Sequence, residues 1–209
     1  MKHSFVNLEL ERALWSQGFA AVAGVDEAGR GPLAGPVVAA AVMFPQDLLL
    51  DDVNDSKQCT PRQREQLFAV IMEQALSVGI GMVDHEEIDR INILQATVLA
   101  MRKSLEHMTV QPEYAIVDGN SFRHETLRFR NVIKGDQKSF TIAAASIVAK
   151  VTRDRLMCEF DARFPQYGFA RHKGYGTRQH IEAIRRYGFC DIHRRSFHPA
   201  ALREDTAPV

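Results

Sequence analysis

The order of the apolar segments restricts the fold more than any other feature of the sequence. Segments 19–27 (FAAVAGVDE) and 36–44 (PVVAAAVMF) follow each other closely, and 77–83 (SVGIGMV) alternates like a third strand. Two later strand-like segments, 114–118 (YAIVD) and 128–133 (RFRNVI), alternate with helical stretches. Early strands that run together, followed by strands and helices in alternation, predict an α/β fold with a mixed five-stranded sheet.

Capping signals locate the helices between and after these strands. Thr60 with Gln63 three residues later forms a capping box, and Asp84 with Glu87 begins the next helical region. A long helix, rich in alanine and valine, is expected over about 140–164. Helices are therefore expected on the faces of the sheet, which is the usual way an α/β sheet is covered.

Composition places the chain in a broad class without indicating its function. The 209 residues suit one large domain, and 45% apolar with 25% charged residues is ordinary for a soluble globular protein. No apolar run approaches the roughly 20 residues that span a bilayer. Cys59, Cys158 and Cys190 fit neither a zinc site nor a disulfide framework. We expect a cytoplasmic protein with no membrane partner, and a monomer, because nothing in the sequence suggests an obligate oligomer.

The charges are distributed unevenly along the chain. Residues 1–120 contain 9 Lys and Arg against 17 Asp and Glu, and residues 121–209 contain 17 against 9. Such asymmetry is typical of a basic surface for nucleic acid, although folding can also interleave the halves so that the charges cancel. The stretches 171–173 (RHK) and 193–195 (HRR) are the candidates for a basic face.

Four acidic residues follow or end the predicted strands. Asp26 and Glu27 end the first strand, Asp118 ends the fourth, and Asp136 follows the fifth. If the first and fourth strands are parallel neighbours, their carboxyl ends meet at the edge where α/β sheets bind ligands. Oxygen ligands without His or Cys suit a hard cation, Mg²⁺ or Mn²⁺. Each acid taken singly is equally compatible with a turn or a helix cap. Asp26 and Glu27, as strand neighbours, can share a site only if the strand bulges or ends there.

The segment 29–34 (GRGPLA) after the first strand has three interpretations. It formally matches the dinucleotide pattern G-x-G-x-x-A, but Pro32 and Pro36 and the strand-like segment that follows disfavour the helix which that fingerprint requires. Alternatively, Gly29 and Gly31 let the backbone approach a sugar or phosphate, with Arg30 gripping the phosphate. The third interpretation is a tight turn between hairpin strands with a solvated arginine.

Basic residues on the long helix and in the last 40 residues have two interpretations each. Lys150 and Arg153 lie three residues apart and share a helix face, where they either reach backbone phosphates or form a solvated stripe. The spacing of His172, His180, His193 and His198 fits no zinc pattern, so these histidines either contact nucleic acid or lie on the surface.

Read together, the motifs resemble the type 2 ribonucleases H, and most closely the bacterial ribonuclease HII family. The matching stretches occur in family order over most of the chain: AGVDEAGRGPLAGPVV (23–38), NDSK (54–57), VDGN (117–120), KGD (134–136), AAASIVAKVTRD (143–154), FPQYGFARHKGYGT (164–177) and HRRSF (193–197). The resemblance implies a ribonuclease H-like catalytic domain at 1–165, with a lead-in segment at 1–18. A helical, basic C-terminal extension at 166–209 would pack on it. Independently of the resemblance, we expect the tail at 201–209 (ALREDTAPV) to be disordered.

The resemblance also implies an activity. It indicates a metal-dependent endoribonuclease that hydrolyses RNA in RNA–DNA hybrids and incises duplex DNA at embedded ribonucleotides, leaving 5′-phosphate and 3′-hydroxyl ends. The catalytic and metal-binding residues would be Asp26, Glu27, Asp118 and Asp136, with two Mg²⁺ or Mn²⁺ ions during catalysis. Gly29, Arg30 and Gly31 would read the 2′-hydroxyl, Tyr175 would pack on the sugar beyond the junction, and Lys57 would touch a phosphate. A non-catalytic nucleic-acid-binding module and a nicotinamide oxidoreductase remain as alternatives.

Overall fold

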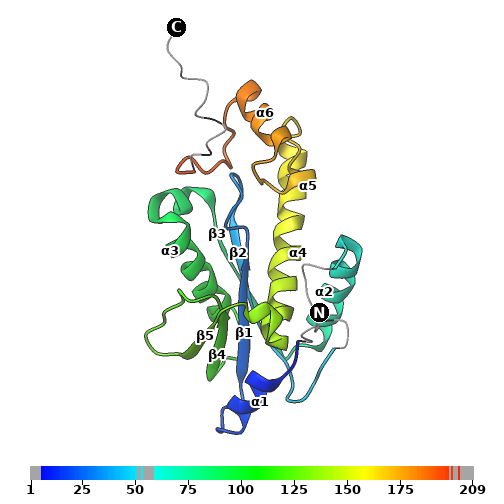
Figure 1. Ribbon diagram of the computed structural model, residues 1–209, viewed down its shortest axis with the longest axis vertical. Coiled ribbons are helices and arrows are strands. Elements are labelled where there is room, and N and C mark those ends of the chain that lie inside the picture. Colours follow the sequence, from blue (N-terminus) through cyan, green and yellow to red (C-terminus); the bar gives the residue numbers. More distant parts are fainter. Residues whose placement is uncertain (1–5, 51–52, 54–58, 198, 200–201, 203–209) are drawn as a thin grey trace.

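A mixed five-stranded sheet forms the centre of the molecule (Figure 1). The computed structural model describes residues 6–50, 53, 59–197, 199 and 202. The strands are β1 (Val22–Ala28), β2 (Val37–Met43), β3 (Ser77–Val83), β4 (Tyr114–Asp118) and β5 (Arg128–Val132), in the order β3-β2-β1-β4-β5. β1 pairs antiparallel with β2 and parallel with β4. The predicted mixed sheet is confirmed, and the predicted parallel pairing of the first and fourth strands is its central feature.

Helices cover both faces of this sheet. In Figure 1, α3 lies on one side of the strands, and α4 and α2 lie on the other. The helices are α1 (Glu9–Trp15), α2 (Pro61–Gln74), α3 (His85–Glu106), α4 (Phe140–Arg163), α5 (Phe169–His172) and α6 (Arg178–Tyr187). The capping box of Thr60 and Gln63 is present at α2, and Asp84 caps α3. Within the described part of the chain, none of the helices has the length and apolar character that crossing a bilayer requires.

The long helix α4 packs directly on β1. Its first half is almost entirely buried, in agreement with its alanine and valine content. A Cβ at Gly24 of β1 would lie 2.2 Å from the backbone carbon of Thr141, so glycine is needed for this close approach. The buried carboxylate of Glu11, in α1, accepts hydrogen bonds from Ser139 Oγ (2.7 Å) and Thr141 N (3.0 Å) at the start of α4. The contact between β1 and α4 therefore brings α4 beside the carboxyl end of β1.

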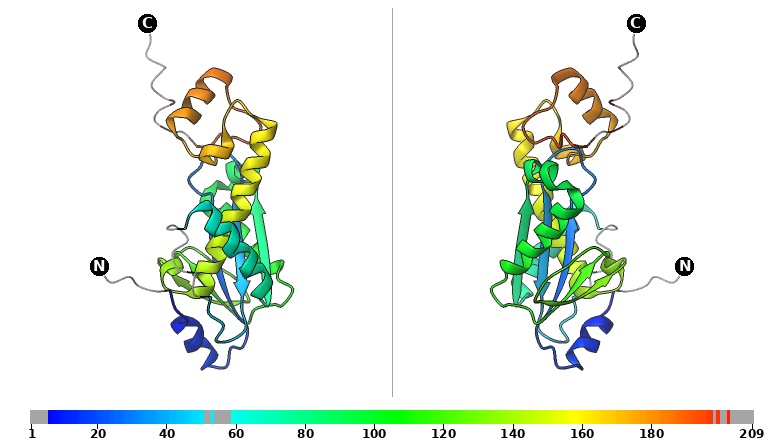
Figure 2. Two further views of the ribbon diagram at one scale, coloured as in Figure 1. Left: turned by 90° about the vertical axis from the view of Figure 1, so that its right-hand side faces the viewer. Right: turned by 90° about the vertical axis from the view of Figure 1, so that its left-hand side faces the viewer.

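The C-terminal segments lie beyond the end of the sheet at which β1 ends (Figures 1 and 2). α5, α6 and the loop after α6 share an apolar cluster with Leu33 and Ala34, which lie between β1 and β2. Leu33 N donates to Gly174 O at 2.8 Å, and Ala34 forms an isolated bridge with His193. The turn after β1 is thus enclosed by residues far along the chain. Apart from Leu202, the expected tail at 201–209 lies outside the described residues.

Candidate active site

Three carboxylates meet at the carboxyl end of the two central strands. Asp26 and Glu27 are the fifth and sixth residues of β1, and Asp118 is the last residue of β4. The parallel register pairs Val25 with Val117, so Asp26 and Asp118 follow at the same level. One oxygen atom from each of the three side chains lies within 4.8 Å of the other two. The structure therefore brings together three of the four predicted carboxylates.

Asp26 and Glu27 reach this site from opposite faces of the sheet. Five consecutive pairs, from Gly24↔Val42 to Ala28↔Val38, join β1 to β2, so no bulge separates the two acids. Asp26 hydrogen-bonds Ser146 of α4, whereas Glu27 shares a small hollow with residues of α3. Because β4 ends at Asp118, none of the described strands lies beside this edge of β1 beyond that level, and the two side chains can meet around the edge. From the sequence, either a bulge or a strand end is expected to explain the shared site, and the end of β4 beside β1 is the explanation.

Burial and mutual repulsion make this cluster unfavourable for three negative charges. Burial raises the pKa of Asp26 well above its usual value, and the charges of Glu27 and Asp118 raise it further. Burial also raises the pKa of Glu27, against which Arg30 acts through an ion pair of 3.3 Å to Glu27 Oε1. A divalent cation would remove the repulsion, and a set of carboxylate oxygens without nitrogen or sulfur is the set that Mg²⁺ or Mn²⁺ prefers. The residues present therefore fit such an ion.

Asp136 lies next to the cluster without being part of it. It is in the 3₁₀ helix η1 (Gly135–Gln137) and is buried, with 5% of its surface exposed. The preceding residue, Gly135, donates its N–H to Asp118 Oδ1 at 2.6 Å. Among the described residues, however, the carboxylates that meet within 4.8 Å are Asp26, Glu27 and Asp118. A metal-binding role for Asp136 stays a prediction.

A pocket of about 440 Å³ adjoins the carboxylates. Gly29, Arg30 and Gly31 line it together with Glu27 and Tyr175. The tyrosine is 47% exposed, and a Cβ at Gly31 would lie 3.5 Å from its ring. Open backbone, a cation and an exposed aromatic ring thus surround one space. That combination suits a sugar–phosphate unit.

The turn from Gly29 to Pro36 leads into a strand and not into a helix. β2 begins at Val37 and runs antiparallel to β1. The dinucleotide interpretation is therefore wrong, because its pyrophosphate sits at a helix N-terminus that this turn does not provide. Gly29 has φ +96°, and a Cβ there would lie 2.0 Å from Arg153 Nε. Glycine is required at this position for both reasons.

Arg153 holds this turn, and the structure corrects the expectation placed on it. Its surface is 1% exposed, so it belongs to no solvated stripe, although it lines the pocket together with Lys150. Its guanidinium donates to three backbone carbonyls: Pro36 O (2.9 Å), Lys173 O (3.0 Å) and Ala34 O (3.1 Å). Burial lowers its pKa to about 10, which leaves it charged at neutral pH. Its role is to join the turn after β1 to the segment after α5.

Arg194 is a second buried arginine that the sequence-based interpretation missed. It is 1% exposed, and its guanidinium donates to Gly29 O (2.6 Å), Gly35 O (2.9 Å) and Arg30 O (3.0 Å). The stretch 193–195 was expected to form a basic face, but Arg194 and His193 are both buried. The only available signal was the presence of HRRSF among the family stretches. The charge of this stretch predicted a basic surface. Arginines can also be buried, however, where their guanidinium groups donate hydrogen bonds to backbone carbonyls.

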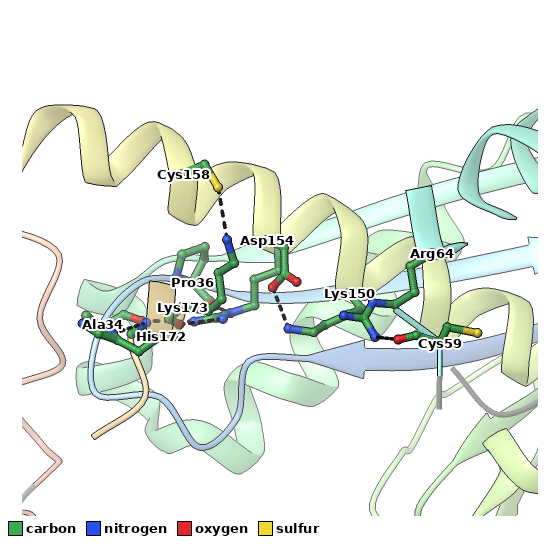
Figure 3. Close-up of polar contacts among 11 residues, drawn as sticks. Ala34, Pro36, Cys59, Arg64, Lys150, Asp154, Cys158, His172 and Lys173 are labelled. Carbon is green, nitrogen blue, oxygen red and sulfur yellow. Dashed lines mark hydrogen bonds and ion pairs between the residues drawn. The ribbon is translucent and has the colours of Figure 1, made fainter. Parts of the chain in front are cut away.

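Lys150 and Arg64 are the other cations at the pocket. Lys150, on α4, pairs with Asp154 Oδ1 at 2.6 Å (Figure 3). It also lines the pocket. Arg64, on α2, lines the same pocket and donates to Cys59 O, and the sequence had not singled it out. Lys57, predicted to touch a phosphate, lies outside the described residues.

Comparisons with known proteins agree on one family. The family model described as ribonuclease HII matches residues 23–200. The chain is 54% identical to a ribonuclease HII of Acetivibrio thermocellus over 187 residues, which are 90% of this chain and 73% of the relative. It is 56% identical to a ribonuclease HII of Geotalea daltonii over 91% of this chain and 88% of the relative. Among solved structures, the ribonuclease H2 of Pyrococcus horikoshii superposes with a TM-score of 0.72 at 29% identity, over 87% of this chain and 95% of the other.

Proposed function

The chain belongs to the ribonuclease HII family, and we propose that Asp26, Glu27 and Asp118 hold the divalent cations with which this endoribonuclease hydrolyses RNA in RNA–DNA hybrids. The observation that carries the proposal is the convergence of three carboxylate oxygens within 4.8 Å beside an open pocket. When bound, Mg²⁺ or Mn²⁺, proposed as a pair during catalysis, supplies the positive charge that activates a water and stabilises a departing 3′-oxygen. Asp136 completes the proposed metal-binding set from η1.

The protein prepares this site in three ways, through two backbone hydrogen bonds and through burial. Asp26 is held by the N–H of Glu27, which donates to its Oδ1 at 2.7 Å, and Asp118 is held by the N–H of Gly135. These hydrogen bonds fix the carboxylates before substrate arrives. Burial of Asp26 removes competing water, which strengthens every charge interaction in the site. Hydrolysis then leaves 5′-phosphate and 3′-hydroxyl ends.

Recognition of the ribonucleotide belongs, in this proposal, to the pocket beside the carboxylates. A 2′-hydroxyl both donates and accepts hydrogen bonds, and the backbone at Gly29 and Gly31 offers both kinds of group without a side chain in the way. Tyr175 would pack on the sugar beyond the scissile bond, and Arg30 and Lys150 would face the backbone phosphates. This arrangement suits a single ribonucleotide embedded in duplex DNA as well as a longer hybrid.

The C-terminal extension from 166 onward has a defined part in this function. It carries Tyr175 to the pocket and Arg194 to the carbonyls of the glycine turn. We therefore assign catalysis to residues 1–165 and the shaping of the substrate pocket to the extension. A monomer contains every residue that the proposed site uses.

One assay tests this proposal: incision of a DNA duplex that contains one ribonucleotide, with Mg²⁺ or Mn²⁺ added. The wild-type protein should cut beside the ribonucleotide and leave the all-DNA duplex intact. Asp118→Asn should lose more than the roughly 10–100-fold typical of removing an outer-shell partner of a metal site. Its affinity for the duplex, measured in Ca²⁺ by fluorescence anisotropy, should change far less.

The matched control is Glu73→Gln, which neutralises an exposed carboxylate on α2 away from the cluster. It should cut as fast as wild type. Equal cutting by Asp118→Asn, or cutting of the all-DNA duplex, would contradict the assignment of the site. Binding without cleavage by the wild-type protein would instead indicate a non-catalytic module.

A further inference from the structure

Three buried histidines lie behind the loop that carries Tyr175. His172 ends α5, His180 lies in the first turn of α6, and His193 lies in the loop after α6. They are 9%, 0% and 1% exposed. The rings of His172 and His180 stack with centroids 4.5 Å apart, and His180 Nε2 lies 3.1 Å from His193 Nε2. The sequence-based expectation of surface or nucleic-acid-contacting histidines is wrong for all three, so another role must explain them. The fourth histidine of that expectation, His198, lies outside the described residues.

The hydrogen bonds determine which nitrogen of His193 and of His180 carries the proton. Cys190 donates its backbone N–H to His193 Nδ1 at 2.9 Å, whereas Cys190 O lies farther from that nitrogen, at 3.3 Å. Because the position of a backbone hydrogen is fixed by the peptide plane, we assign Nδ1 as the acceptor and Nε2 as the nitrogen that carries the hydrogen. His193 Nε2 therefore donates to His180 Nε2. His180 must then carry its hydrogen on Nδ1, which lies 3.0 Å from Tyr175 O. The result is a one-way chain from Cys190 through both rings to the carbonyl of Tyr175.

His172 makes a second chain of the same kind. Gly174 donates its N–H to His172 Nδ1 at 3.2 Å, so Nδ1 is the acceptor and Nε2 carries the hydrogen. His172 Nε2 donates to Tyr167 O at 2.8 Å. The histidines thus bind the N–H of Gly174 and the C=O of Tyr175, the two backbone groups on either side of one peptide unit.

Each ring is satisfied only in its neutral form. A second proton on His180 or on His193 would place two N–H groups against each other. Burial lowers the pKa of His180 to about 4, and burial with the neighbouring His180 lowers that of His193 to about 4. Burial lowers the pKa of His172 as well. The ionisable groups that act on the three rings from neighbouring segments are His85, Asp161, Arg171 and Arg195. Both chains are therefore intact at neutral pH.

The loop held in this way sets the position of Tyr175 in the pocket. Gly174 O accepts the N–H of Leu33 at 2.8 Å, which fixes the loop against the turn after β1. A Cβ at Gly174 would lie 2.6 Å from Ala34 O, so the loop is closely fitted there. The ring of Tyr175, by contrast, is 47% exposed and lines the pocket. Its position depends on the backbone to which it is attached.

We propose that His180 and His193, as a relay of two neutral imidazoles, are positioning residues that place Tyr175 and so set the preference for a ribonucleotide followed by DNA. The inference rests on the proposed contact of Tyr175 with the sugar beyond the junction. The histidines touch neither substrate nor metal in this role. They act through the backbone of the loop at Gly174 and Tyr175.

The first test measures cleavage of two substrates, a duplex with one ribonucleotide and a uniform RNA–DNA hybrid. The quantity compared is the kcat/KM for the single-ribonucleotide duplex divided by the kcat/KM for the hybrid. His180→Leu should lower this ratio by about tenfold, because a small displacement of a positioning group is costly. His180→Asn should retain most of the ratio, because its amide N–H can replace the Nδ1–H that binds Tyr175 O. His107→Leu, at an exposed histidine of the α3 C-terminus, is the matched control and should keep the ratio unchanged.

The same ratio in a Tyr175→Ala background decides how the histidine acts. Tyr175→Ala should lower the ratio, and adding His180→Leu should lower it no further. An unchanged ratio in His180→Leu, or a further loss in the double variant, overturns this inference alone. An unchanged ratio in Tyr175→Ala overturns the proposed role of the tyrosine, and the inference with it. Incision of the duplex by His180→Leu or by Tyr175→Ala shows that the metal site of that variant is intact.

A second test needs no variant and no substrate. Nitrogen-15 NMR of the imidazoles in the wild-type protein at neutral pH should identify His180 as the Nδ1–H tautomer and His193 as the Nε2–H tautomer, both uncharged. The opposite tautomers, or charged rings, would refute the relay even if His180→Leu does not fold.

Discussion

Neutralising Asp26 should make the metal-free protein more stable while it abolishes activity. Asp26→Asn keeps an oxygen that can accept the N–H of Glu27, so the change removes a charge with little change of shape. The three carboxylates offer oxygens within 4.8 Å of one another, and Asp26 takes part in two of the three repulsive pairs. The substitution thus isolates the cost of assembling the acidic cluster.

The magnitude follows from the geometry. Two full charges 4.8 Å apart repel by about 3.5 kcal/mol at an effective dielectric constant of about 20. Proton uptake relieves part of this repulsion, because the pKa values of Asp26 and Glu27 are raised. We therefore expect a gain of about 1–3 kcal/mol in the free energy of unfolding at pH 8, which is a rise in Tm of about 2–12 °C for a chain of this size.

The assay is thermal unfolding at pH 8, first in EDTA and then with Mn²⁺. In EDTA, Asp26→Asn should melt above wild type, and Glu73→Gln should melt with wild type. Added Mn²⁺ should raise the Tm of the wild-type protein, because it binds the folded state, and raise that of Asp26→Asn much less. A lower Tm for Asp26→Asn in EDTA would refute the argument that repulsion dominates this cluster. An equal response of both proteins to Mn²⁺ would refute the assignment of the ion to it.

Two further predictions concern the glycine turn and the buried histidines. Gly29→Ala should lower the free energy of unfolding by more than about 2 kcal/mol, because the backbone there has φ +96° and the added Cβ would meet Arg153. Gly31→Ala should be as stable as wild type and yet cut a ribonucleotide-containing duplex more slowly. Urea unfolding that shows equal stability of both variants would contradict this difference. Acidification from pH 7.5 to 5 should lower the free energy of unfolding of wild type by about 2 kcal/mol more than that of His180→Asn. The reason is that His180 in the unfolded chain, with a pKa near 6.5, takes up a proton over this range, whereas the folded residue, with a pKa of about 4, does not. The raised pKa values of Asp26 and Glu27 favour the folded state as the pH falls, and they do so equally in wild type and in His180→Asn. The difference between the two proteins therefore reports on His180, and an equal loss of stability in both would refute the burial of a neutral His180.

The strands and the acidic residues at their ends could be predicted because both depend on local pattern. Side-chain periodicity and capping residues are properties of short windows, and β3, β4 and the capping box of α2 agree with their predicted positions. The carboxyl ends of β1 and β4 meet because parallel neighbours place like ends together, which brings Asp26 and Asp118 to one site. An argument from strand order was sufficient for that part of the site.

The roles of the basic residues could not be predicted in the same way. Arg194 binds the carbonyl of Gly29 from a position 165 residues away along the chain, and Arg153 reaches Pro36 across 117 residues. A charge in a sequence indicates what a side chain can bind, but the partner depends on which distant backbone groups are buried beside it without another donor. The same holds for His180 and His193, whose neutral state results from burial against each other. Local pattern therefore determined the sheet and the acidic edge, and long-range packing determined which cations and histidines shape the pocket beside it.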